Sequence, residues 1–186
     1  MNEELLNKKY KIKIYEEIPS THLFVKENQH KLENGTVIIA NKQTSGIGTH
    51  GRSWYTGSSN IAMSIIYKPN CDITKLDGIT INIAKSIKEA INELYNIELQ
   101  IKYPNDLLLN GKKLCGILTE TNTISKKVNY LIISIGFNVN EINFDGKTKK
   151  IATSLKKEYK KDFDKEKIIY KIIENIDKIT EFVWME

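Results

Sequence analysis

Few residues of this sequence are suited to hold a metal or a disulfide. The 186 residues include only two cysteines and three histidines. Cys71 and Cys115 lack the C-x-x-C spacing of metal and redox motifs, so we assign them no role. His22, His30 and His50 show no ligand spacing with one another or with the cysteines. The histidines are therefore treated as individual groups.

Targeting and membrane signals are also missing. No apolar run approaches the ~20 residues that cross a bilayer, and the first residues, MNEELLNKKYKIKIY, lack the apolar core of a secretion signal. We therefore expect a cytoplasmic protein with no membrane partner. Without repeats or low-complexity linkers, residues 1–186 are expected to form one domain. The net charge of +5 comes from scattered lysines that are typical of solvated faces, so no nucleic-acid partner is expected.

Hydrophobic periodicity predicts the secondary structure. The expected strands cover 10–18, 36–43, 60–68, 97–103 and 128–140, with a hairpin over 106–121 and helices over 21–32, 74–95 and 165–184. Asn110-Gly111 suits the type I′ turn of that hairpin. Strands that follow one another through hairpins, with helices between the groups, favour an α+β fold. We expect a mixed, mostly antiparallel sheet, with 128–140 as a central strand and helices packed on one side.

A glycine-rich stretch, TSGIGTHGRSWYTG, contains the pattern G-x-G-x-x-G at Gly46, Gly48 and Gly51. A dinucleotide-binding fingerprint requires a helix directly after the third glycine, whereas turn residues and a strand follow here. The loop lacks the Gly-Lys-Ser/Thr of a Walker loop. The chain also lacks the H-R-D and D-F-G motifs of protein kinases. All three nucleotide-binding classes are therefore excluded.

Another kind of ligand site remains open for this loop. Three glycines allow positive φ angles, so backbone N–H groups can turn inward and hold an anion. Arg52 adds a cation and Trp54 a flat face for a ring. The alternative is a glycine-rich hairpin loop that binds nothing.

A second polar cluster lies in KYPNDLLLNGKKLCGILTE. Lys102 and Lys113 flank Asn105 and Asp106, so the two cations could converge on a phosphate while the carboxylate meets a metal or an amine. Gly116 removes a side chain where a ligand, or simply another part of the backbone, comes close.

The stretch IGFNVN ends the expected central strand. The side-chain amide of Asn138 has the donor and the acceptor that an adenine edge requires. A turn at the strand end is the alternative role for this asparagine.

Five stretches in this order resemble the catalytic domain of biotin protein ligases: PSTHLF, NKQTSGIGTHGRSW, KYPNDLLLNGKKLCGILTE, IGFNVN and ATSLKKE. The resemblance runs from about Tyr15 to Glu158. It implies the mixed antiparallel sheet shared with class II aminoacyl-tRNA synthetases, which agrees with the fold class expected from periodicity.

The resemblance also implies a two-step reaction. Biotin would react with Mg²⁺-ATP to give biotinyl-5′-adenylate. A lysine of a biotin carboxyl carrier protein, from acetyl-CoA carboxylase or another biotin-dependent carboxylase, would then accept the biotin. A homodimer is left open.

Residue roles follow from the resemblance alone. It implies biotin contacts by Ser20, Thr21, His22, Gln43, Gly46 and Gly116. It implies contacts to ATP or the adenylate by Ile47, Gly48, Thr49, Arg52, Trp54, Lys102, Asn105, Lys113 and Asn138. Lys113, Asp106 and Arg52 would be catalytic. Asp106 would either orient the incoming amine or bind magnesium, through water, and the sequence leaves both open.

The chain departs from the family pattern at several positions. Ile47, Thr49 and His50 stand where the family commonly has arginines, His22 where it often has asparagine, and Tyr103 where it often has tryptophan. No helix-turn-helix segment and no small C-terminal β-domain are recognisable, so we expect no transcriptional repression. Two other functions remain under consideration. One is a lipoate or octanoate ligase, and the other is a module that binds biotin or its adenylate without efficient transfer.

Overall fold

A seven-stranded sheet forms the centre of the molecule. The computed structural model describes residues 10–146 and 148–184. Its strands are β1 (Ile12–Ile18), β2 (Thr36–Gln43), β3 (Ile61–Tyr67), β4 (Gln100–Lys102), β5 (Asp106–Leu109), β6 (Lys112–Ile124) and β7 (Lys127–Phe137). They lie in the order β1-β2-β3-β7-β6-β5-β4. The middle position of β7 confirms the central strand predicted over 128–140.

The sheet is mixed and mostly antiparallel, as the sequence predicted. Among the seven strands of the described residues, β1 and β2 pair in parallel, and the other neighbouring strands pair antiparallel. Parallel neighbours need a crossover connection, and here helix α2 (Thr21–Asn28) supplies it.

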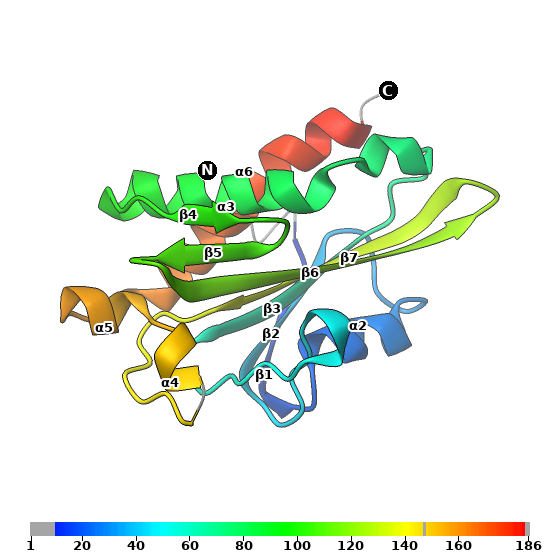
Figure 1. Ribbon diagram of the computed structural model, residues 1–186. Coiled ribbons are helices and arrows are strands. Elements are labelled where there is room, and N and C mark those ends of the chain that lie inside the picture. The colour runs from blue at the N-terminus through cyan, green and yellow to red at the C-terminus, as the bar shows by residue number, and fades with distance from the viewer. Residues whose placement is uncertain (1–9, 147, 185–186) are drawn as a thin grey trace.

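Helices cover both faces of the sheet. In addition to α2 they are α3 (Ile79–Tyr95), α4 (Thr148–Ile151), α5 (Leu155–Tyr159) and α6 (Lys165–Trp184), with 3₁₀ turns η1 (Thr49–Gly51) and η2 (Ile73–Leu76). Helices α3 and α6 lie on one face and α2 lies on the other (Figure 1). The expectation of helices on one side was therefore wrong. Strand β2 is apolar on both faces, with Val37 and Ile39 facing one core and Ile38 and Ala40 the other.

Several predicted boundaries differ from the observed ones, and the strand expected over 97–103 is only Gln100–Lys102. The helix predicted from 74 begins at Ile79, because Gly78 takes a left-handed φ of 73° and separates it from η2. The helix predicted to end at Leu32 ends at Asn28. The type I′ turn is confirmed, because Asn110 and Gly111 have φ angles of 50° and 76°.

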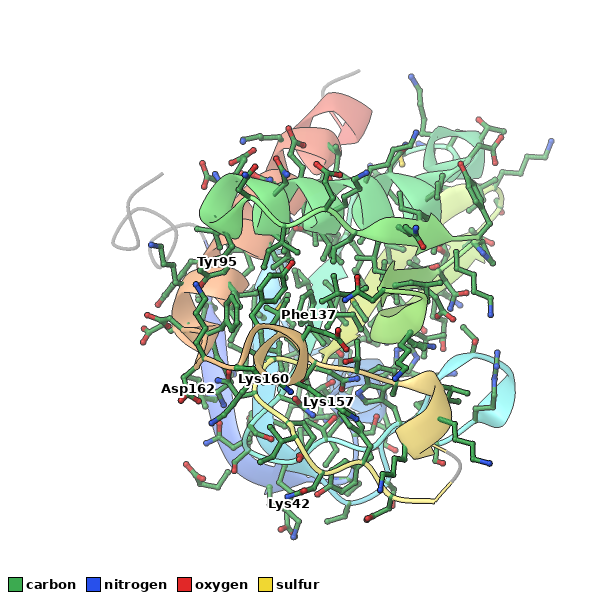
Figure 2. All side chains as sticks on the ribbon, turned by 60° about the vertical axis from the view of Figure 1, so that its left-hand side comes forward. Lys42, Tyr95, Phe137, Lys157, Lys160 and Asp162 are labelled. Atoms are coloured by element: carbon green, nitrogen blue, oxygen red, sulfur yellow. The ribbon has the colours of Figure 1, made fainter. Side chains whose placement is uncertain are left out.

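The interior contains aliphatic and aromatic side chains, and charged side chains surround it. Figure 2 shows Phe137, which is fully buried, inside the molecule and Lys42 at its outside. Tyr95 packs edge-on against Phe163, with ring centroids 4.9 Å apart, where α3 meets the segment before α6. Within the described residues, no helix combines the length and apolar character needed to cross a bilayer.

Candidate active site

Two cross-strand rows of residues shape the face of the sheet beneath α2. The register places one row of four residues and, next to it on the same face, a row of small residues that ends in a carboxylate. The first row is Ile38, Ser64, Ser134 and Leu118. The second row is Ala40, Ala62, Gly136, Gly116 and Asp106. Side chains two residues apart in a strand share a face, so the first row supplies hydroxyls and the second leaves space above the sheet.

The indole of Trp54 fills part of that space. Gly116 and Gly136 pair across β6 and β7 and together form a flat platform under the ring. A Cβ at Gly136 would lie 2.3 Å from Trp54 Cε2, and one at Gly116 would lie 3.1 Å from Trp54 Cζ3. The sequence predicted a ligand or backbone close to Gly116, and the groups that come close are the side chains of Trp54 and Lys113. The indole Nε1 is buried and has no hydrogen-bond partner within the described structure, so a ligand acceptor at this point would satisfy it.

A lysine–carboxylate pair lies beside the tryptophan. Lys113 Nζ is 2.7 Å from Asp106 Oδ1 and 5.3 Å from the centroid of the Trp54 ring. The side chains are 28% and 19% exposed, so the pair is partly shielded but still open to the cleft. A positive group at this point can stabilise negative charge that develops on a bound ligand.

The backbone of Lys113 is fixed by a segment far along the chain. The Thr153 N–H donates to the Lys113 carbonyl at 2.9 Å. The Glu158 carboxylate accepts hydrogen bonds from Thr153 and from Asn110 in the hairpin turn, and these bonds hold its pKa below the usual range. The ATSLKKE segment therefore anchors the hairpin that carries Lys113.

The other end of the cleft is polar and lies at the beginning of α2. Ser20 caps the helix by accepting a hydrogen bond from the Leu23 N–H. Gln43, at the end of β2, accepts from the Thr21 N–H at 2.8 Å and from the Thr21 hydroxyl at 3.2 Å. Its amide nitrogen donates to the Thr56 hydroxyl at 3.1 Å. These bonds fix the orientation of the Gln43 amide.

The glycine loop is built differently from the expected array of inward N–H groups. Of its three motif glycines only Gly51 has a positive φ, of 69°, while Gly48 is extended. The Gly48 N–H donates to the Arg52 carbonyl, so it is used within the loop. Position 46 requires a glycine because the backbone of Trp54 passes close to it. A Cβ at this position would lie 2.2 Å from the Trp54 carbonyl oxygen. The loop therefore positions Trp54 over the sheet.

Most of the predicted site residues line one cleft, which encloses about 430 Å³ including space open to solvent. These are Ser20, Thr21, His22, Gln43, Ile47, Gly48, Thr49, Trp54, Asn105, Lys113 and Gly116. Asp106 and Gly46 join the site through their contacts with Lys113 and Trp54.

Three predicted residues lie away from the cleft lining. Arg52 is exposed and folds back onto Thr49, with Nε 3.2 Å from the Thr49 carbonyl. Lys102 is exposed on β4. Asn138 is buried just beyond β7, where its backbone N–H donates to the Leu114 carbonyl.

Comparison with known proteins identifies the family. A model of the biotin/lipoate A/B protein ligase family matches residues 14–138. The chain belongs to this family. It is 36% identical over 168 residues to the bifunctional ligase/repressor BirA of Bacillus subtilis, covering 86% of this chain and 51% of that protein. It is 29% identical over 110 residues to the biotin–[acetyl-CoA-carboxylase] ligase of Paracoccus denitrificans, covering 58% of this chain and 46% of that ligase. The chain thus spans about half the length of these relatives.

Solved structures agree with the family assignment. The biotin protein ligase of Aquifex aeolicus in complex with biotin and ATP superposes with a TM-score of 0.81 and 28% identity. The match covers 94% of this chain and 72% of that one. The predicted fold, a mixed sheet flanked by helices as in class II aminoacyl-tRNA synthetases, is confirmed.

Sequence reasoning missed several residues of this ligase-family cleft. They are Ala62, Ile117, Leu118, Ser134, Ile135 and Gly136. A signal for some of them was present, because small or polar residues alternate with large apolar ones within β3 and β7. That alternation marks the strand face on which a cavity lies.

Proposed function

We propose that this chain is an ATP-dependent biotin protein ligase, which activates biotin as biotinyl-5′-adenylate and transfers it to a lysine of a biotin carboxyl carrier protein. The proposal is supported by the relatives named above and by the two chemically different ends of the cleft. One end has the uncharged donors and acceptors of Thr21 and Gln43. The other has a tryptophan ring and the ammonium of Lys113, 5.3 Å from that ring.

This division is the observation that carries the proposal. The head group of biotin is a cyclic urea, which needs neutral hydrogen bonds. Its adenylate also contains a base, which stacks on aromatic rings, and a phosphate, which requires a cation. The cleft lining contains both kinds of group, with Gln43 among the uncharged partners and Lys113 beside Trp54.

In the first step, an oxygen of the biotin carboxylate attacks the α-phosphorus of Mg²⁺-ATP and pyrophosphate leaves. Lys113 stabilises the negative charge that grows on the phosphate oxygens. Asp106 orients Lys113 through the 2.7 Å ion pair. Magnesium enters with ATP as part of the substrate. A single carboxylate matches the way this ion is usually held, by one or two protein carboxylates and the phosphates.

In the second step, the neutral ε-amine of the carrier lysine attacks the carbonyl carbon of the mixed anhydride. An amide bond forms, AMP leaves with the bonding electron pair, and the amine gives up a proton. The cytoplasmic setting and the absence of a nucleic-acid partner are still predictions. The identity of the carrier protein and the formation of a homodimer are still open.

Pyrophosphate release tests the proposal. With ATP and biotin we expect release in single-turnover amounts, and continued turnover after a biotin carboxyl carrier domain is added. Release with lipoate or octanoate in place of biotin would identify an acyl ligase of the other branch of the family. Biotin binding without pyrophosphate release would identify a binding module.

A further inference from the structure

A continuous chain of hydrogen bonds runs beneath the cleft from the surface to Gln43. It begins at the Glu120 carboxylate, which lies 3.0 Å from Nε2 of the buried His22. His22 Nδ1 lies 2.9 Å from the Ser134 hydroxyl, which is 2.7 Å from the Ser64 hydroxyl. Ser64 donates to Thr21 at 2.8 Å. The Thr21 hydroxyl in turn lies 3.2 Å from Oε1, the side-chain amide oxygen of Gln43.

The direction of this chain follows from its far end. Gln43 Oε1 faces the Thr21 backbone N–H, which can only donate, so this atom is the acceptor. The Thr21 hydroxyl must therefore give its proton to Gln43. Since Ser64 gives its own proton to Thr21, the short contact between the two serines needs the proton of Ser134.

This direction of donation determines which nitrogen atoms of the His22 ring carry a proton. A serine hydroxyl has one proton, and that of Ser134 points to Ser64, so Ser134 must accept from His22 Nδ1–H. The remaining nitrogen, Nε2, faces a carboxylate and needs a proton to form its own bond. We propose, resting on the biotin-binding role assigned above, that His22 is a positioning residue held as an imidazolium. Its Nδ1–H orients the hydroxyls that read the biotin head group, and its Nε2–H bonds the Glu120 carboxylate.

Neighbouring charges support a positive ring. Burial acts to raise the pKa of Glu120, but hydrogen bonds from His22 and Lys26 outweigh it and leave this pKa below the usual range. Lys26 Nζ lies 3.0 Å from Glu120 Oε1, so the carboxylate is ionised and cannot supply a proton to His22.

Aliphatic and hydroxyl side chains lie on the sheet face beneath α2. Helix α2 packs on β2, β3 and β7. From these strands Ile38, Ser64 and Ser134 lie on the same face, and Tyr130 of β7 lies near enough to act electrostatically on Lys26.

The consequence for the ligand is a fixed pattern of acceptors. The hydroxyl protons of Ser134 and Thr21 are both committed along the chain, so these two cleft-lining residues offer the ligand only oxygen lone pairs. A cyclic urea has two N–H donors that match such acceptors, whereas a dithiolane ring has none. If His22 were neutral with its proton on Nε2, Ser134 would have to donate its proton to Nδ1. The contact between Ser134 and Ser64 would then contain no proton.

Nitrogen NMR of the ligand-free protein labelled at histidine tests the protonation directly. Three histidines give three ring signals, and His30→Asn removes that of the exposed His30 to aid assignment. At about pH 7.5, above the ordinary range of a solvated imidazole, His22 is expected to show protons on both ring nitrogens. A single protonated nitrogen would overturn the proposal. Because no ligand is present, this result is independent of whether the protein is a biotin ligase.

Biotin affinity across pH tests the role. In the wild type, the biotin Kd measured by calorimetry should stay constant between about pH 6.5 and 8.5. Glu120→Gln removes the counter-charge, so the protonated, binding-competent ring is lost as the pH rises. Affinity should then fall roughly 3- to 10-fold across the same range, the cost of one misdirected hydrogen bond.

Lys26→Gln is the matched control, because it removes a cation from the same carboxylate but leaves the bond to His22. It should keep a constant Kd. Identical pH profiles for Glu120→Gln and the wild type would refute the positioning role. Absence of biotin binding by the wild type would instead refute the proposed function, and the ring NMR would still decide the protonation of His22.

Discussion

The glycine platform under Trp54 allows a sharp test of the nucleotide end of the cleft. Gly136→Ala adds a methyl group 2.3 Å from Trp54 Cε2 and 2.4 Å from Nε1, about 1 Å short of an ordinary contact. The crowded group is a rigid ring with no flexible end, so the whole indole must leave the platform. If this ring stacks on the base of ATP, its loss removes about 1–3 kcal/mol of binding. ATP affinity should fall roughly 5- to 100-fold.

Fluorescence and calorimetry measure the two parts of this prediction. In a Trp184→Phe background only Trp54 emits, and its emission should shift to the red as the ring becomes solvated. The biotin Kd should change less than ATP affinity, because the head group binds at the Thr21 end. Gly57→Ala is the control, since its Cβ would meet only the side chain of the exposed Tyr55. A red-shifted emission with unchanged ATP affinity in Gly136→Ala would refute the stacking role of Trp54.

Three further results are expected. Lys113→Ala should slow pyrophosphate release by ~10²–10³, because it removes a cation aimed at growing negative charge; release at the wild-type rate, with an unchanged melting temperature, would show that the assignment is wrong. Biotin affinity through Gln43 and Thr21 should vary little with salt, whereas ATP affinity should weaken as salt rises, and equal salt slopes in calorimetry would contradict this division. Because Thr49 stands where the family commonly has arginine, we expect the wild-type loop to retain the adenylate weakly, so that released adenylate labels unrelated proteins. Thr49→Arg should slow adenylate release in stopped flow, since a charge-assisted bond to phosphate is worth roughly 1.5–3 kcal/mol. Unchanged release in this variant, together with no labelling of an unrelated protein by the wild type, would refute this expectation.

Local sequence patterns predicted the elements of this fold better than their arrangement. The type I′ turn at Asn110-Gly111 depends on neighbouring residues alone, and it was found. The covering of both sheet faces was missed. The helix expected from residue 21 does begin at Thr21, but its sequence does not show which face of the sheet it will cover.

The site residues that belong to sequence motifs could be predicted. Those that reach the site only through the pairing of particular strands could not. Lys113 and Trp54 stand in recognisable stretches, and the structure brings them together. Ser134 and Gly136 become site residues only because β7 pairs with β3 and β6 in one particular register. Arg52 was expected at the ligand, yet its side chain is satisfied by Thr49 within its own loop. Such local hydrogen bonds cannot be foreseen from residue type.

The central position of β7 has a consequence for folding. β3 and β6 meet only through this strand, although β3 ends at Tyr67 and β7 begins at Lys127. During synthesis, the β1–β2–β3 half therefore exposes an unpaired and mostly apolar edge strand, every residue of which is buried in the finished fold, until some sixty further residues have emerged. Contacts of such sequence separation form slowly, and exposed strand edges invite pairing between chains. The nascent chain thus depends on the late arrival of one strand to close its sheet and its ligand cleft together.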